Sequence, residues 1–224
     1  MLVLVILCAP GCAALQQDLA GVIAGAGSGS LDEATVIAGL KQALEVGTGN
    51  AVLSTSKLDG YLGNQLIRIA VPEQLRSAAS TLRTIGLGSQ VDELETGMNR
   101  AAELAAGEAR GIFWNAIKGM SVSDAFGILR GHDTAATEYF RGRTIGELRE
   151  RFRPIVEAKI GQIGLSRVYG RISEAYNNFA PAGSERLVDL DDYVTEKALG
   201  GLFTVLGQEE TKIRRDPVAR TTDL

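Results

Sequence analysis

Residues 97–120 read "GMNRAAELAAGEARGIFWNAIKGM", and apolar side chains recur through them at three- and four-residue steps. The same rhythm begins upstream at Val91 and Leu94, so one apolar stripe would extend along roughly seven helical turns. We therefore predict a single central helix over residues 91–116. Because the middle of the stripe is rich in alanine, a neighbouring helix could approach its backbone closely there.

Three polar residues stand beside this stripe, namely Asn99, Arg100 and Glu103. Arg100 and Glu103 are three positions apart, which is close enough for their side chains to pair on a helix surface. We interpret them as the solvated or boundary side of a bundle helix. The alternative interpretation is a substrate site.

Upstream of the central helix the sequence also favours helices. Residues 31–47 carry apolar side chains at helical spacing, and Pro72 is suited to begin a helix that runs to Gly86. Residues 66–71, "LIRIAV", alternate like a strand but have no strand partner elsewhere in the chain. We expect them to form an extended connector.

Downstream, two capping-box patterns suggest helix starts: Ser121 with Asp124, and Thr144 with Glu147. A last long helix is expected from residues 189–192 to just before Pro217. The sequence therefore predicts an all-α chain, with residues 31–224 forming a single globular multi-helix domain of about eight helices.

The first 30 residues have a different composition. Residues 1–12 combine an apolar run too short to span a bilayer with small residues before Cys12, which is typical of the end of a truncated signal peptide with a lipobox. Residues 13–30 are rich in glycine and serine and are expected to form a flexible tether. We expect lipidation at Cys12, export, and membrane anchoring in the periplasm, at the outer membrane.

Composition excludes several classes of function. The formal net charge is −4, so no overall basic field favours nucleic acid, and we expect no nucleic-acid partner. The chain has two cysteines, Cys8 and Cys12, and one histidine, His132. Zinc and similar metals prefer thiolate and imidazole ligands, so we expect no metal site and no cofactor. We interpret His132 as part of a helix start.

The final helix brings glutamates to its apolar stripe, at Glu209 or Glu210. A carboxylate at a core edge needs a compensating partner, and we predict that Arg100 of the central helix supplies it. The candidate polar cluster comprises Asn99, Arg100, Glu103, Tyr139, Glu209, Glu210 and Arg214.

Several longer stretches together resemble one known family. They include "GLKQALEVGTGNAV", "MNRAAELA", "SVSDAFGILRG" and "DLDDYVTEKALGGLF", and they follow one another in the family's order. On these stretches the chain resembles the bacterial domain-of-unknown-function family 4197 over nearly all of residues 38–220. The resemblance implies an exported envelope protein with a helical domain, and it carries no established activity or catalytic residues.

Three functions remain open on the sequence alone. The favoured hypothesis is a non-enzymatic envelope lipoprotein that binds a lipid-like ligand or an envelope protein partner. The second is a metal-independent enzyme in which Glu209 or Glu210 acts as acid or base while Arg100 and Tyr139 bind an anionic substrate. The third is a structural scaffold.

Overall fold

The computed structural model describes residues 32–162, 164–179 and 189–215. The chain divides into two compact units, residues 1–36 and residues 37–224, and the contacts discussed below lie within the second unit. The predicted signal segment, the tether and Cys12 lie outside the described residues.

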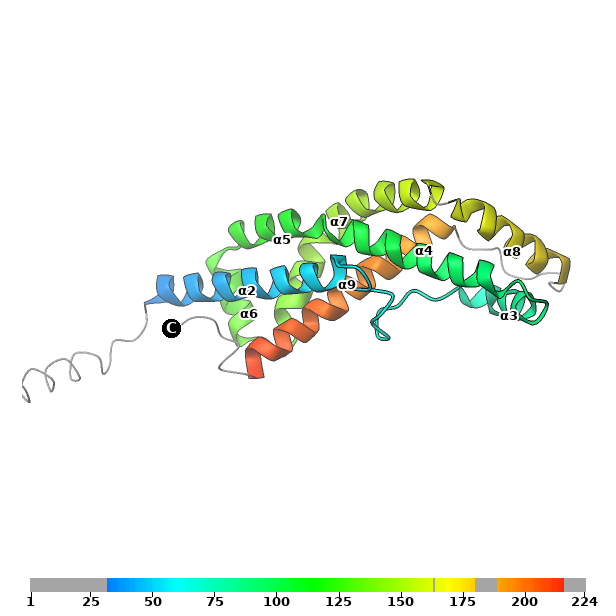
Figure 1. Cartoon of the computed structure of the whole chain (residues 1–224). Helices are drawn as coiled ribbons and strands as arrows, with labels where there is room; N and C mark the ends of the chain where they lie inside the picture. Colours follow the sequence, from blue (N-terminus) through cyan, green and yellow to red (C-terminus); the bar gives the residue numbers. More distant parts are fainter. Residues whose placement is uncertain (1–31, 163, 180–188, 216–224) are drawn as a thin grey trace, which may run out of the picture. The chain divides into compact units, whose positions relative to one another are not determined.

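The described residues contain eight α-helices, one short 3₁₀ helix and no β-strand, which confirms the all-α fold (Figure 1). The elements are α2 (Glu33–Ser56), η1 (Glu73–Leu75), α3 (Arg76–Thr84), α4 (Gly88–Ala106), α5 (Ala109–Lys118), α6 (Val122–Arg130), α7 (Ala135–Gln162), α8 (Leu165–Phe179) and α9 (Leu190–Arg215).

The predicted central helix is two helices. The chain turns at Gly107 and Glu108, where the amide of Glu108 bonds the Ala105 carbonyl three residues earlier, so α4 ends and α5 begins in a new direction. The apolar stripe nevertheless continues through the break, because Ala105 and Ala109 are both fully buried. Helix α4 packs against α7 and α9, and its alanines Ala101, Ala102, Ala105 and Ala106 are fully buried.

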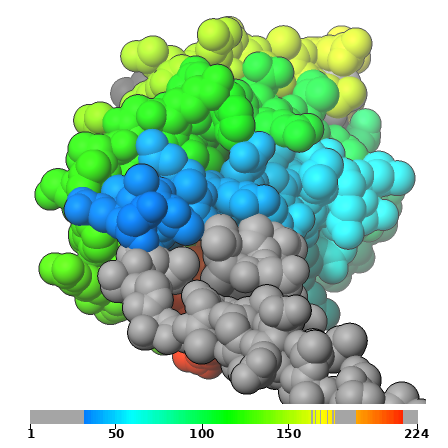
Figure 2. Space-filling view, turned by 90° about the vertical axis from the view of Figure 1, so that its left-hand side faces the viewer, coloured from blue at the N-terminus to red at the C-terminus, as the bar shows by residue number. Residues whose placement is uncertain are grey.

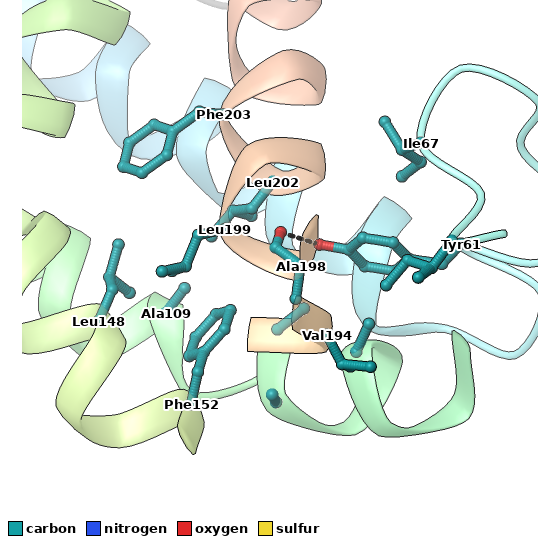
Figure 3. Close-up of a cluster of buried hydrophobic side chains, with 14 of the residues drawn as sticks. Tyr61, Ile67, Ala109, Leu148, Phe152, Val194, Ala198, Leu199, Leu202 and Phe203 are labelled. Atoms are coloured by element: carbon teal, nitrogen blue, oxygen red, sulfur yellow. Dashed lines mark hydrogen bonds between the residues drawn. The ribbon is translucent and has the colours of Figure 1, made fainter. Parts of the chain in front are cut away.

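The most extensive helix contacts join α7 to α9 and to α4. Figure 3 shows α9 passing between two groups of side chains, with Tyr61 and Ile67 on one side and Leu148 and Phe152 on the other. Further along the core, the Phe113 ring meets the rings of Phe140 and Phe203 edge to face. Burial of these large apolar side chains is the main favourable term in the stability of the fold.

The two predicted capping boxes have different outcomes. At α6 the prediction is confirmed, since the Asp124 amide donates to the Ser121 hydroxyl and the Ser121 amide donates to the Asp124 carboxylate. At Thr144 the prediction is wrong, because α7 begins at Ala135 and runs straight through. Thr144 is buried inside α7, where its hydroxyl bonds the carbonyl of Phe140. The bounds of α7 are therefore set by its packing against α9 and not by the local capping pattern at Thr144.

Helix α2 lies against the C-terminal half of α9. A β-carbon on Gly47 would lie 2.9 Å from Ile213 Cδ1, so the two helices approach closely here and a larger residue would require the Ile213 side chain to shift. The amide of Asn50 donates to Glu209 across the same contact. In Figure 2 the light-blue surface of α2, from residue 37 on, borders the green surface of α4 and α5. Ser56, the last residue of α2, lies near Gly107.

Candidate functional site

The connector between α2 and η1 is held by three side chains of α4. Glu95, Asn99 and Glu103 are four residues apart, so they lie along one face of the helix. Each accepts hydrogen bonds from connector amides: Glu95 from Val71, Asn99 from Ile69, and Glu103 from Tyr61 and Leu62. The prediction that residues 66–71 form an extended connector is confirmed only in part: residues 65–67 form a turn in which the Ile67 amide bonds the Asn64 carbonyl. Ile69 and Val71 beyond it pair with helix side chains in place of a neighbouring strand.

Glu103 is almost fully buried and has several partners. Its Oε1 accepts the amides of Tyr61 and Leu62 at 3.1 and 3.3 Å, and its Oε2 lies 2.6 Å from Arg100 Nη1. The second Arg100 amino group bonds Asp59 at 2.8 Å. Hydrogen bonds to Glu103 and then to Asp59 raise the pKa of the Arg100 guanidinium. The predicted pairing of Arg100 with Glu103 is confirmed, although Glu103 is a buried residue and not a solvated one.

The turn that carries Asp59 depends on close packing. Asp59 adopts a left-handed backbone conformation, with φ of 61°. A β-carbon on the following Gly60 would lie 2.5 Å from the carbonyl oxygen of Thr55, so only glycine fits there. Tyr61 then enters the core, and its hydroxyl donates to the Ala198 carbonyl of α9 at 2.6 Å (Figure 3). Burial raises the pKa of the Tyr61 phenol.

A second charged centre lies at the start of α7. The carboxylate of Glu210, on α9, accepts the amides of Ala136 and Thr137 and the Thr137 hydroxyl. It also pairs with Arg214 at 2.8 Å, and Arg214 in turn donates to the carbonyl of Ile128 at the end of α6. Glu210 thus satisfies helix N-terminal amides that would otherwise lack acceptors.

The structure does not bring the predicted polar cluster together. Arg100 pairs with Glu103 and Asp59, whereas Glu210 pairs with Arg214, so the predicted contact between Arg100 and Glu209 or Glu210 is wrong. Glu209 bonds Lys212 and Asn50. The Tyr139 hydroxyl donates to the Ala116 carbonyl of α5. The physical reason is that each buried carboxylate already has its partners. Glu103 and Glu210 each pair with an arginine of their own helix and accept backbone amides from another segment.

An open groove adjoins the Arg100 centre. It has a volume of about 720 Å³ and is lined by residues of α4 and α7, by the last residue of α2 and by Leu58 after it: Ser56, Leu58, Ser89, Asp92, Glu93, Thr96, Gly97, Arg100, Glu103, Leu104 and Lys159. A second hollow of about 590 Å³ shares Leu104 and Lys159 and continues past Pro154 and Ile155. The two form one surface, hereafter the α4–α7 groove.

Two leucines expose apolar surface in the α4–α7 groove, Leu58 at 72% and Leu104 at 56%. Sequence reasoning missed them. Leu104 had a visible signal, since it lies off the buried stripe of its helix and faces solvent. Leu58 had none, because its position depends on the turn at Asp59 and Gly60.

The lining charges of the groove are mixed. Asp92 pairs with Arg83, and Glu103 pairs with Arg100. Glu93 and Lys159 take part in no salt bridge with another described residue. The groove therefore offers a ligand one carboxylate, Glu93, and one ammonium, Lys159, beside apolar surface.

His132 lies just before α7, where its carbonyl accepts the Ala135 amide, in agreement with its interpretation as part of a helix start. Its exposed ring lies 3.4 Å from Glu138. Within residues 32–162, 164–179 and 189–215, no three His, Cys, Asp or Glu side chains gather in a way that could hold a metal ion. None of the helices in this part of the chain has an apolar stretch long enough to cross a bilayer.

Comparisons with known proteins place the chain in one family. A search of curated proteins and a search of solved structures each found no match. Residues 30–224 match the family described as "Protein of unknown function (DUF4197)", which covers every helix and both charged centres described above. The chain belongs to the DUF4197 family.

Proposed function

We propose that this protein is a non-enzymatic envelope lipoprotein whose helical domain binds a single-chain, lipid-like ligand in the α4–α7 groove. The observation that carries the proposal is the exposure of Leu58 and Leu104 inside a groove of about 720 Å³. Ligand sites commonly have volumes of a few hundred to about 1,000 Å³ and combine apolar walls with a few polar groups.

The charges of the groove favour a zwitterionic headgroup. Glu93 and Lys159 have opposite signs, so a phosphate near Lys159 and an ammonium near Glu93 would each find a partner. The acyl chain would cover Leu104 and continue toward Pro154 and Ile155. Removing these apolar surfaces from water would supply most of the affinity.

The geometry gives less support to an enzyme built on the predicted cluster. That hypothesis needs a glutamate of α9 close to Arg100 and Tyr139, and the three belong to separate contacts. Glu210 already accepts five hydrogen bonds, three from α7 and two from Arg214, so it has little capacity left to bind a substrate proton.

The ligand proposal is tested by titrating the protein with lysophosphatidylethanolamine below its micelle concentration and measuring heat. We expect saturable binding that weakens at least about tenfold in Leu104→Asp, because a charge replaces apolar contact. Leu66→Asp is the matched control, since Leu66 is 72% exposed and lies outside the groove. Equal weakening in both variants, or no saturable binding, would contradict the proposal and favour a scaffold.

We also propose that Cys12 carries the membrane anchor. Its support is the short apolar run and the small residues that precede Cys12 in the sequence. In cells that express the protein from its native start, Cys12→Ser should move it from the membrane fraction to the soluble fraction, while Cys8→Ser should not. Unchanged fractionation of Cys12→Ser, together with an unmodified mass for the mature protein, would refute this anchor.

A further inference from the structure

Helices α5 and α6 expose large apolar side chains that neither the α4–α7 groove nor the core uses. Trp114 is 38% exposed, Val122 is 52% exposed and Leu129 is 38% exposed. The two helices follow one another closely in the chain, because only residues 119–121 separate them. Large apolar side chains that stay exposed on consecutive helices are candidates for an interaction surface.

Two exposed apolar residues of α6, Val122 and Leu129, form a stripe with the partly buried Phe126. Val122, Phe126 and Leu129 are spaced by four and three residues, so they lie along one side of the helix. Ala125 and Ile128 form the neighbouring side and are buried. The apolar face of α6 is therefore wider than the buried face that packs against the rest of the protein.

A cation lies over the exposed Trp114 ring and another over the partly buried Phe126 ring. The Lys118 ammonium lies 4.8 Å from the centre of the Trp114 ring, and the Arg130 guanidinium lies 5.0 Å from the centre of the Phe126 ring. Residues 109–131 hold three cations, including Arg110, and one acid, in a chain whose net charge is −4. That acid, Asp124, is bound in the capping box of α6.

We propose that the α5–α6 face docks on an anionic lipid surface. Trp114 and the Val122, Phe126 and Leu129 stripe would lie at the boundary between headgroups and acyl chains, where amphipathic aromatic rings are favoured. Lys118 and Arg130 already lie beside these rings and would contact lipid phosphates. This surface would orient the domain against the membrane, independently of any ligand in the α4–α7 groove.

Trp114 makes the proposal directly testable, because it is the sole tryptophan of the chain. Its emission reports on this face alone, whatever other segment touches the membrane. With vesicles that contain phosphatidylglycerol, we expect a blue shift and quenching by brominated acyl chains. With phosphatidylcholine vesicles we expect neither, and added salt should weaken the response to anionic vesicles.

Two sets of variants separate the contribution of the cations to vesicle binding from that of the apolar side chains. Lys118→Glu with Arg130→Glu should weaken vesicle binding by at least about tenfold, since each cation near an anionic surface is worth roughly fivefold. Val122→Ser with Leu129→Ser should lower the blue shift, whereas Leu66→Ser with Ile85→Ser removes comparably exposed side chains elsewhere and should not. Urea unfolding of every variant checks that the domain remains folded.

Three outcomes would overturn the proposal. One is an unchanged Trp114 spectrum when the protein sediments with anionic vesicles, which would assign attachment to another part of the chain. Another is vesicle binding that is unaffected by both α5–α6 variants while they remain folded. The last is a blue shift that appears without vesicles as protein concentration rises, which would assign the face to a second copy of the chain.

Discussion

Asn99 of α4 exchanges two hydrogen bonds with the backbone of a single residue, Ile69. Its carbonyl accepts the Ile69 amide at 2.9 Å, and its amide donates to the Ile69 carbonyl at 2.8 Å. A neighbouring β-strand residue would make the same pair of bonds. The Asn99 side chain thus makes the hydrogen bonds that a neighbouring strand would make. The backbone of Ile69 can therefore be buried with its amide and carbonyl hydrogen-bonded, although it has no sheet partner.

Asn99→Ala should therefore be strongly destabilising. The substitution leaves the buried amide and carbonyl of Ile69 without partners, and we expect a loss of about 3 kcal/mol in the free energy of unfolding. Asn115→Ala, at an exposed position of α5, is the matched control and should change it by less than about 0.5 kcal/mol. Urea unfolding measures both, and similar values for the two variants would contradict this role.

Two adjacent glycines of α9 should respond to alanine in opposite directions. A β-carbon on Gly201 would lie 2.6 Å from the Tyr61 ring, so Gly201→Ala should destabilise the protein by about 1–3 kcal/mol. A β-carbon on Gly200 meets nothing within 4 Å, so Gly200→Ala should stabilise the helix by about 0.5–1 kcal/mol. Thermal unfolding of the pair gives the sign directly, and a shared sign would show that Tyr61 packs elsewhere.

A double-mutant cycle separates the observed partner of Arg100 from the one the sequence predicted. Arg100→Met and Glu103→Gln should couple by at least about 1 kcal/mol, because Glu103 is buried and the pair is 2.6 Å apart. Arg100→Met and Glu210→Gln should couple by less than about 0.5 kcal/mol, since the two groups share no contact. Reversed magnitudes would restore the sequence prediction.

The helices could be predicted because their signal is local. Apolar residues at three- and four-residue steps mark the buried stripes of α4, α5 and α9, and the capping box at Ser121 marks the start of α6. The same local reasoning failed at Thr144, where the capping pattern is present but the buried side of α7 continues through it. Packing free energy over a long helix exceeds the effect of one cap.

The candidate site was harder to predict because its partners are remote in sequence. Asp59 and Arg100 are 41 residues apart, and Glu210 reaches amides 73 and 74 residues earlier. Periodicity indicated that these carboxylates lie near the core, but not which donors they meet. The spacing of Glu95, Asn99 and Glu103 was visible, yet a stripe of polar residues on a helix normally faces water.

The capping box of α6 predicts a measurable pKa. The hydroxyl and amide of Ser121 hold the pKa of the Asp124 carboxyl below its ordinary value. Since the pKa is lower in the folded state, the stabilisation is present above the unfolded-state pKa and is lost as pH falls through the folded-state pKa. Carboxyl NMR titration should show this lowered pKa, and Ser121→Ala should raise it. An equal pKa in both proteins would contradict the assigned hydrogen bonds.

Glu210 and its neighbour Glu209 allow the last prediction, which concerns the join between α6, α7 and α9. Both oxygens of Glu210 accept hydrogen bonds, so Glu210→Gln places an amino group against donors whichever way it turns. We expect a loss of about 3 kcal/mol in the free energy of unfolding, because Arg214 and helix amides lose a buried anion.

The effect should also be local. Hydrogen exchange of the Ala136 and Thr137 amides should accelerate in Glu210→Gln beyond the change expected from global stability, since these amides lose their acceptor. Glu209→Gln should cost less than about 1 kcal/mol, because Glu209 pairs with an exposed lysine and Gln can still accept from Asn50. If Glu209→Gln proved as costly as Glu210→Gln, or if the two amides kept their protection, Glu210 would not be the residue that joins α9 to the start of α7.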